Sequence, residues 1–221
     1  MARLKTAVLI SGRGSNLQAL IEANERPGFE AEIVTVLSNR PEAHGLVRAK
    51  QAGIPTTLID HHDYADRAQF DEALHHALME AGAELVCLAG FMRILGAPFV
   101  ERWPDKVINI HPSLLPAFQG LDVHERVLEA GVRVTGCTVH FVVPELDSGP
   151  IIVQAAVPVH ADDTPERLEV RVLEAEHQCY PLAVRLIAQG RVRVVGGIAH
   201  IDDARAPLTF LLNPAVEEPP R

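Results

Sequence analysis

Residues 107–116 (VINIHPSLLP) place an amide and an imidazole at the end of a predicted strand. Because side chains alternate between the two faces of a strand, Asn109 and His111 share one face with Val107. An amide donor beside an imidazole could stabilise a developing oxyanion and transfer a proton. The alternative is a hydrogen-bonded core histidine, with an asparagine that turns the chain before Pro112. A functional pair is favoured, because open α/β sheets bind ligands at the carboxyl ends of their strands.

A turn over residues 145–150 (ELDSGP) could bring a carboxylate to this histidine. Asp147 beside His111 would favour the charged imidazolium and orient its ring. The same string is also typical of an ordinary turn. A hydrolytic triad would instead use Ser11, Ser15 or Ser113 as its nucleophile. The absence of a G-x-S-x-G elbow from the sequence counts against that hydrolase.

The loop 11–17 (SGRGSNL) directly follows the first predicted strand and opens the first predicted helix. Glycines let a backbone approach a ligand closely, and the free N–H groups at a helix start attract phosphate. The loop therefore predicts an anion site, in which Ser15 and Asn16 cap the helix or donate to the ligand. It differs from the dinucleotide fingerprint, because Leu17 stands where a third Gly or Ala would allow close packing. The alternative is an ordinary tight turn.

The elements that must position these residues follow from the alternation of apolar runs with helical patterns. Strands are predicted at 7–10, 33–37, 57–59, 84–89 and 106–110, and helices around 17–21, through Lys50 to a stop at Gly53, and at 69–81. Strands separated by helices in this way imply βαβ units. We therefore expect an α/β fold with a Rossmann-like, mostly parallel sheet that carries helices on both faces.

The pattern changes after about Gly131. Residues 138–143 and 151–159 are predicted as two antiparallel strands, because the turn-rich segment that joins them is too short for a crossover. A helix is expected to begin at residues 163–166 (DTPE), which combine a capping side chain with a first-turn proline, and to bend at Pro181. Residues 191–195 are predicted as the last strand. The tail 214–221, rich in Pro and Glu, is expected to be mobile.

The composition excludes several classes of protein. Twenty Lys and Arg against 29 Asp and Glu give a net charge of −9, and no basic cluster is present to neutralise nucleic-acid phosphates. No apolar run reaches the length of about 18 residues that a membrane span needs, and the N-terminal residues do not resemble a signal peptide. The sequence therefore predicts a cytoplasmic protein without nucleic-acid or membrane partners, in which positive groups grouped locally could still bind anionic ligands.

Neither the cysteines nor the histidines show the spacing of metal ligands. Cys87, Cys137 and Cys179 lie far apart and are interpreted as small buried residues in a reducing compartment. The pairs His61–His62 and His75–His76 look most like ligands, but adjacent residues on a helix point about 100° apart. We expect both pairs on a solvated surface, and no metal site.

Seven strings in this order and spacing resemble one family over roughly residues 5–195: SGRGSNLQAL, VLSNR, AGIPT, LAGFMRIL, INIHPSLLP, VHFVVPELDSGPII and EAEHQCYP. This family is the folate-dependent phosphoribosylglycinamide formyltransferases of purine synthesis. The resemblance implies transfer of a formyl group from 10-formyltetrahydrofolate, as co-substrate, to the amine of glycinamide ribonucleotide. It also implies one formyltransferase domain over 1–221, with a nucleotide-binding half at about 1–100 and a folate and catalytic half at about 101–200. A monomer or a homodimer is expected.

The resemblance also implies roles for individual residues. Asn109, His111 and Asp147 would carry the catalysis. The substrate phosphate would be held by Gly14, Ser15 and Asn16, and the ribose hydroxyls by Glu176. The folate would contact Arg67, Met92, Arg93, Ile94, Leu95, Asn109, Val143, Pro144, Glu145, Leu146 and Asp147. In this set Arg67 and Arg93 would meet the carboxylates of the glutamate tail. The plain alternatives are core positions for Met92, Ile94 and Leu95, a solvated Arg67 and a surface Glu176.

The sequence also departs from the family pattern. Arg13 stands where a small polar residue is frequent and could add a phosphate contact, whereas Pro144 removes an N–H from the folate loop. Residues 118–122 (FQGLD) also differ, in a stretch expected to form a mobile loop over the site.

Several other functions stay open at this point. Methionyl-tRNA formyltransferase and formyltetrahydrofolate hydrolase would each need a further domain, for which we expect no room. A non-catalytic folate- or nucleotide-binding module and a nicotinamide-dependent oxidoreductase are the alternatives from other classes.

Overall fold

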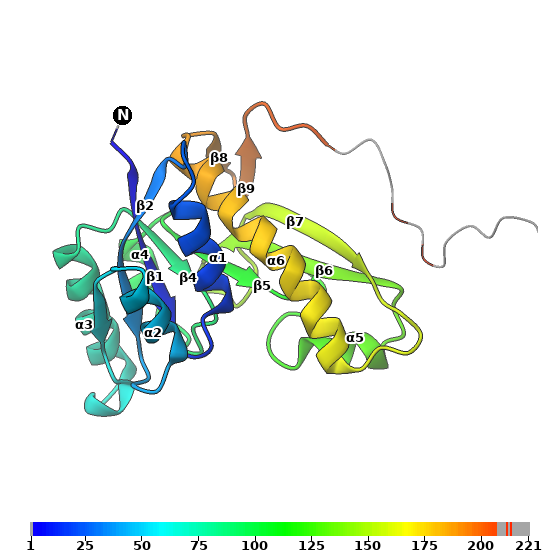
Figure 1. The fold of residues 1–221 in the computed structure, drawn as a ribbon, viewed down its shortest axis with the longest axis horizontal. Coiled ribbons are helices and arrows are strands. Elements are labelled where there is room, and N and C mark those ends of the chain that lie inside the picture. The colour runs from blue at the N-terminus through cyan, green and yellow to red at the C-terminus, as the bar shows by residue number, and fades with distance from the viewer. Residues whose placement is uncertain (1, 207–210, 212, 214–221) are drawn as a thin grey trace, which may run out of the picture.

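In the computed structural model, which describes residues 2–206, 211 and 213, one seven-stranded sheet has the order β3-β2-β1-β4-β5-β6-β7 (Figure 1). Its strands are β1 (Leu4–Ile10), β2 (Ala31–Ser38), β3 (Thr56–Leu58), β4 (Leu85–Leu88), β5 (Val107–His111), β6 (Val134–Phe141) and β7 (Ile151–Pro158). The first five strands pair in parallel, and β6 and β7 continue the sheet antiparallel. The predicted fold class is confirmed.

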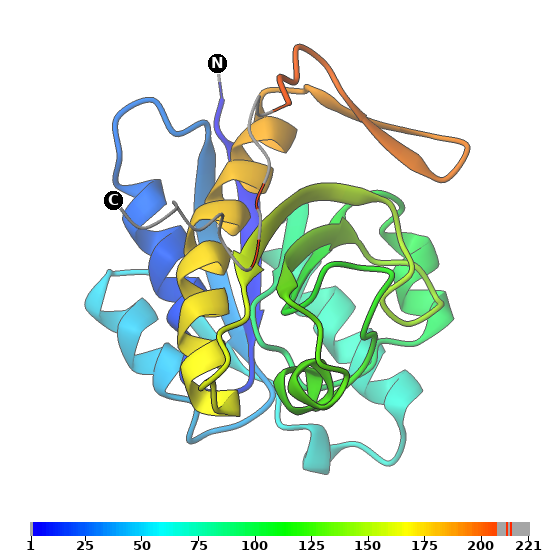
Figure 2. The same ribbon diagram turned by 90° about the vertical axis from the view of Figure 1, so that its right-hand side faces the viewer.

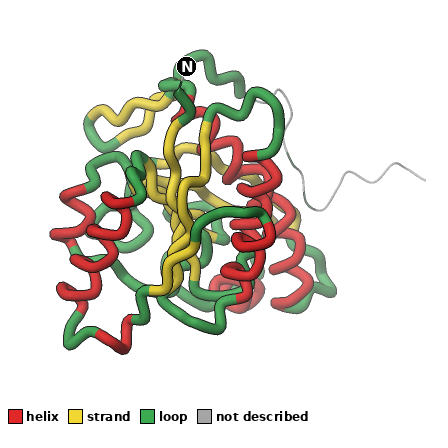
Figure 3. Tube along the Cα trace, turned by 60° about the vertical axis from the view of Figure 1, so that its left-hand side comes forward, coloured by secondary structure: helices red, strands yellow, loops and turns green. Residues whose placement is uncertain are grey.

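Helices cover both faces of this sheet (Figure 3). They are α1 (Ser15–Asn24), α2 (His44–Gln51), α3 (Arg67–Glu80), α4 (Ala97–Arg102), α5 (Val123–Glu129) and α6 (Pro165–Ala188), with a short 3₁₀ turn at His61–Asp63. Alternate residues of β1 point to opposite sides. Val8 and Ile10 therefore pack with α1, α2, α5 and α6, whereas Ala7 and Leu9 pack with α3 and α4. Each face thus has its own hydrophobic core.

Helix α6 begins where the sequence predicts and holds the middle of the sheet. The Thr164 hydroxyl accepts from the Arg167 N–H, and Pro165 is the first helical residue. On the buried face of α6, the Tyr180 hydroxyl lies 3.0 Å from the Leu88 carbonyl oxygen and 3.2 Å from the Ile108 carbonyl oxygen. These two hydrogen bonds join α6 to both β4 and β5. The helix continues through Pro181 without interruption.

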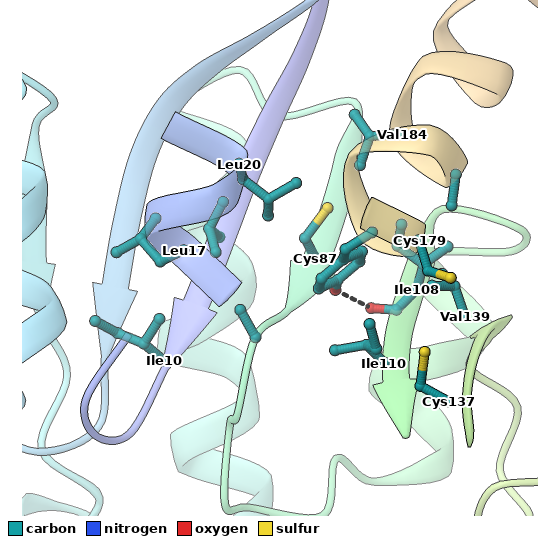
Figure 4. Close-up of a cluster of buried hydrophobic side chains, with 14 of the residues drawn as sticks. Ile10, Leu17, Leu20, Cys87, Ile108, Ile110, Cys137, Val139, Cys179 and Val184 are labelled. Atoms are coloured by element: carbon teal, nitrogen blue, oxygen red, sulfur yellow. Dashed lines mark hydrogen bonds between the residues drawn. The ribbon is translucent and has the colours of Figure 1, made fainter. Parts of the chain in front are cut away.

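The three cysteines are buried, as predicted, and all three belong to the hydrophobic core on the α6 side of the sheet (Figure 4). Burial raises the pKa of the Cys87 thiol well above its ordinary value. This thiol therefore stays protonated and acts as a small apolar side chain. In the described part of the chain, no helix has both the length and the hydropathy needed to cross a bilayer.

The strand predicted at residues 191–195 is confirmed as β8 (Val192–Val195), but it is not the last strand. Strand β8 is followed by β9 (Ile198–Ile201), and the two form a separate antiparallel sheet that projects from the main body (Figure 2). Gly196 and Gly197 join them with φ values of 59° and 78°. A two-residue hairpin turn favours such positive φ values, so the Gly-Gly pair was a usable signal. The predicted mobile tail 214–221 lies outside the described residues.

Candidate active site

The structure brings the three predicted catalytic residues together. Asn109 and His111 lie on β5, and Asp147 lies in the link between β6 and β7. Asp147 Oδ2 is 3.4 Å from His111 Nδ1, and the two side chains are 8% and 7% exposed. The link folds back over the sheet to reach this position, and its ends are joined by the hydrogen bond from the Phe141 N–H to the Pro150 carbonyl oxygen. The result is a buried cluster of polar groups.

His140 is a fourth member of this cluster, and it was not predicted. It lies directly opposite Asn109 in the antiparallel pairing of β5 and β6. Its Nε2 is 3.4 Å from Asn109 Nδ2 and 3.8 Å from Asp147 Oδ1. Because its Nδ1 donates to the Phe141 carbonyl oxygen at 2.8 Å, Nε2 of the neutral ring is left to accept from Asn109. Burial lowers the pKa of His140, so this histidine stays neutral and orients the Asn109 amide.

The loop that follows β5 closes over the cluster. His111 Nε2 is 2.9 Å from the Phe118 carbonyl oxygen, and the Gly120 N–H donates to Asp147 Oδ2 at 2.9 Å. Gln119 Nε2 also donates to the Asp147 carbonyl oxygen at 3.0 Å. The segment predicted as a loop over the site therefore does lie there, and it fixes both the histidine and the aspartate.

The loop after β1 is shaped by close contact with α2. Gly14 has a φ of 71°, and a Cβ at this position would lie only 2.7 Å from Gly45 Cα, so a larger residue cannot fit. The Gly45 N–H donates to the Gly12 carbonyl oxygen. Gly14 is the N-cap of α1, and no side chain among the described residues caps this helix. Of the two roles considered for Ser15 and Asn16, capping of the helix is therefore not observed, and donation to a ligand stays a prediction. The first-turn N–H groups remain free for a ligand, as an anion site requires.

Glu176 lies beside this loop, as expected from the resemblance, and it is not a surface carboxylate. It is 7% exposed, and its Oε2 accepts from Asn16 Nδ2 at 2.7 Å. Burial raises the pKa of Glu176 from 4.5 to about 7, with the Asn16 hydrogen bond opposing and the nearby Glu169 charge adding to the shift. Asn16 Oδ1 is buried and has no hydrogen-bond partner among the described residues. The pair thus combines a weakly acidic carboxyl group with an unused acceptor.

We expect Glu176→Gln to stabilise the protein at pH 8 but not at pH 4. The raised folded-state pKa means that the native state binds a proton which the unfolded state releases between pH 4.5 and about 7. The wild type therefore loses stability as the pH rises from 4.5 to about 7, by roughly 3 kcal/mol in total. Urea unfolding at both pH values measures this. The exposed Glu174→Gln is the control, and equal midpoints for Glu176→Gln and wild type at pH 8 would contradict the expectation.

The predicted folate residues divide into exposed and buried groups. Met92 and Ile94 are 62% and 63% exposed and so are not core residues, whereas Leu95 is 7% exposed and packs in the core on the α3 side. In the link to β7, Val143 is half-buried, and Pro144, Glu145 and Leu146 are exposed. Of Met92, Ile94 and Leu95, therefore, only Leu95 occupies a core position.

Asp71 lies close enough to both predicted arginines for their charges to act on it, and it was not found from the sequence. Its buried carboxylate accepts from the Gly96 N–H at 2.8 Å. Burial raises its pKa, while the positive charges of Arg67 and Arg93 act in the opposite direction. The arginines therefore lie near one buried carboxylate, although they are far apart in the sequence.

Two of the three serines weighed as hydrolase nucleophiles, Ser11 and Ser113, are occupied by structural hydrogen bonds. The Ser11 hydroxyl donates to Asn39 Oδ1 at 2.6 Å and accepts from the Met92 N–H at 2.7 Å. The Ser113 hydroxyl is fully buried and donates to the Ala117 carbonyl oxygen. Ser11 thus links the loop after β1 to the loop after β4, which supports a role in site assembly.

His61 and His62 do not point apart, contrary to the prediction for adjacent residues on a helix. They lie in a 3₁₀ turn rather than an α-helix, with ring centroids 3.9 Å apart. With Asp60 they place three possible ligand atoms within 4.8 Å of one another. However, His61 Nδ1 lies 3.0 Å from the Asn39 carbonyl oxygen, and His62 Nδ1 lies 2.8 Å from Asp60 Oδ1. These ring nitrogens already have protein partners.

Comparisons with known proteins cover most of the chain. The family model described as formyl transferase matches residues 4–184. A phosphoribosylglycinamide formyltransferase from Haemophilus influenzae is 42% identical over 209 residues, which are 95% of this chain and 99% of that protein. The crystal structure of glycinamide ribonucleotide transformylase 1 from Symbiobacterium toebii superposes with a TM-score of 0.89 at 46% identity, over 91% of this chain and 95% of that one.

A longer relative is also similar. The trifunctional purine biosynthetic protein adenosine-3 of Gallus gallus is 57% identical over 192 residues, or 87% of this chain. The chain spans only 19% of that protein's length.

Proposed function

Because the chain belongs to the formyl transferase family, and within it to the phosphoribosylglycinamide formyltransferases, we propose that Asn109, His111 and Asp147 carry formyl transfer from 10-formyltetrahydrofolate to the amine of glycinamide ribonucleotide. The observation that carries this assignment is the buried cluster in which Asp147 Oδ2 lies 3.4 Å from His111 Nδ1. The chain is a one-carbon transferase of purine biosynthesis.

The reaction requires stabilisation of a negative oxygen and transfer of a proton. When the amine attacks the formyl carbon, a carbon–nitrogen bond forms and the carbonyl oxygen becomes negative. Asn109 and His111 donate to this oxygen, in the manner of an oxyanion hole. The attacking nitrogen becomes positive and must lose a proton, and the folate nitrogen must gain one as its bond to the formyl carbon breaks. Asp147, through a water molecule, relays this proton.

The geometry of His111 supports its role as a charged donor. Nε2 faces the Phe118 carbonyl oxygen and Nδ1 faces the Asp147 carboxylate. Both partners are acceptors, so the doubly protonated ring satisfies both. The ring can then give up its contact with Phe118 to the reacting oxygen.

Substrate binding follows from the elements around the cluster. Gly14, Ser15 and Asn16 bind the phosphate at the uncapped start of α1, and the weakly acidic Glu176 hydrogen-bonds the ribose hydroxyls. The folate contacts the exposed side chains of Met92 and Ile94.

The rest of the folate set divides by position. Leu95 supports the folate loop from the core, and the link residues Val143, Pro144, Glu145 and Leu146 enclose the pterin. Arg67 and Arg93 meet the glutamate tail beside Asp71.

A coupled assay tests the proposed function. 10-Formyltetrahydrofolate is offered with and without glycinamide ribonucleotide, and release of tetrahydrofolate is followed. Release that requires the amine is the expected result. Release without the amine would instead identify a hydrolase, and no release with normal folate binding would identify a binding module.

A further inference from the structure

The loop after β1 is tied to α6 by two side-chain contacts. Arg13 forms an ion pair with Glu169, and Asn16 hydrogen-bonds Glu176. Glu169 and Glu176 are seven residues apart, about two helical turns, so they lie on the same face of α6. Both contacts thus join the segment from Arg13 to Asn16 to the same face of α6.

The two contacts differ in burial. Asn16 and Glu176 are 8% and 7% exposed, whereas the Arg13 and Glu169 side chains are 79% and 40% exposed. Ion pairs in water contribute little, because the solvated ions are nearly as stable apart. The Arg13–Glu169 pair therefore separates easily, while the Asn16–Glu176 pair keeps the loop in place.

The Arg13 backbone is fixed, so only its side chain is free to move. Arg48 Nε donates to the Arg13 carbonyl oxygen at 3.0 Å, and the neighbouring Gly12 carbonyl oxygen accepts from Gly45. A guanidinium on a rigid loop beside the free amides of α1 can reach an anion bound there without rearranging the site. The buried Asn16 Oδ1, which has no partner in the described part of the chain, also indicates a ligand that donates to it, such as a ribose hydroxyl.

We propose that Arg13 exchanges Glu169 for the phosphate of the substrate, and that it thereby selects phosphorylated over unphosphorylated ribosides. This inference rests on the proposed function of the site. A phosphate dianion is the stronger partner, because it carries more charge than a carboxylate and can likewise accept two parallel N–H bonds from the guanidinium. Glu169 is then a competitor of the substrate, which holds Arg13 in position while the site is empty.

Substitutions of Arg13 and of Glu169 should change the Kd for the substrate in opposite directions. In calorimetric titrations with glycinamide ribonucleotide, Arg13→Ser is expected to raise Kd about tenfold, the size of a lost hydrogen bond to a charged group. Glu169→Gln is expected to lower Kd about two- to fivefold, since it frees Arg13 from an exposed pair. The double variant should match Arg13→Ser alone. Glycinamide riboside, which lacks the phosphate, should bind all four proteins equally.

A purely structural role for the pair predicts a different pattern. If Arg13 and Glu169 only fix the loop to α6, both single variants raise Kd, and this result would overturn the proposal. Tighter binding by Glu169→Gln that persists in the double variant would also overturn it, because the effect would then come from general repulsion. The control Arg167→Ser removes an exposed, paired arginine two residues from Glu169 and should leave Kd unchanged.

Turnover is not needed for this test. Titrations with ribose 5-phosphate report on Arg13 even if the enzyme transfers no formyl group to glycinamide ribonucleotide, so failure of the proposed function and failure of the exchange are distinguishable. In kinetic assays, the KM for 10-formyltetrahydrofolate should be the same in Arg13→Ser and wild type, whereas the KM for the amine substrate should rise.

Discussion

Replacing His111 by alanine is expected to lower kcat by about 10²–10³-fold while the protein stays folded. The substitution removes a donor to the negative oxygen of the tetrahedral intermediate, and loss of one such donor costs about 3–4 kcal/mol in the transition state. Asn109 and the substrate-binding loops remain, so KM should change little. The same logic predicts a comparable loss for Asn109→Ala, since both donors lie on one face of β5.

Steady-state kinetics with both substrates measure this loss, and urea unfolding shows whether the fold is retained. His76→Ala is the matched control, because this histidine is on α3 with a side chain that is 69% exposed. It should keep wild-type kcat. Normal turnover from folded His111→Ala would refute the catalytic assignment of this histidine.

The second large effect is expected for Asp147, where two substitutions separate charge from hydrogen bonding. Asp147→Asn keeps an acceptor for the Gly120 N–H but removes the negative charge beside His111. We expect kcat to fall about 10²-fold, the usual contribution of a positioned proton-transfer group. Asp147→Ala also leaves the Gly120 N–H without its partner, which costs about 1–3 kcal/mol of stability if the amide stays buried.

Hydrogen exchange of the backbone amides provides the second measurement. Residues 118–122 should exchange at the wild-type rate in Asp147→Asn and faster in Asp147→Ala, because only the alanine variant loses the contact that holds the loop. If both variants lose the same activity and the same protection, Asp147 acts through loop order alone. If Asp147→Asn is fully active, the charge has no role in the proton relay.

Much of the fold is readable from the sequence, because the apolar content of the strands is high and local. The runs that became β1, β2 and β4 stand out before any pairing is known. Helices α4 and α5 are short, at six and seven residues, and offer too few turns for a clear helical period. Their place in the fold depends on tertiary packing rather than on local pattern.

The candidate site was only partly predictable for a related reason. Asn109 and His111 are two residues apart on one strand, so the period of the strand alone places them together. His140 joins them only through the register of β5 with β6, and Arg93 comes near Arg67 and Asp71 of α3 only through tertiary packing. Strand register and helix packing involve residues far apart in the chain, which no local pattern encodes.

The strand order β1-β4-β5 also sets the distance between the loop after β1 and the polar residues of β5. One strand separates the loop after β1, where the substrate phosphate is proposed to bind, from the β5 residues proposed to act on the amine. At about 4.8 Å between neighbouring strands, the two positions are roughly 10 Å apart across the sheet. Backbone hydrogen bonds fix this spacing, and the Tyr180 hydroxyl lies against carbonyl oxygens of both β4 and β5. If both positions act as proposed, we expect a substrate to be selected by the length between its anionic and reactive ends, as well as by the chemistry of each end.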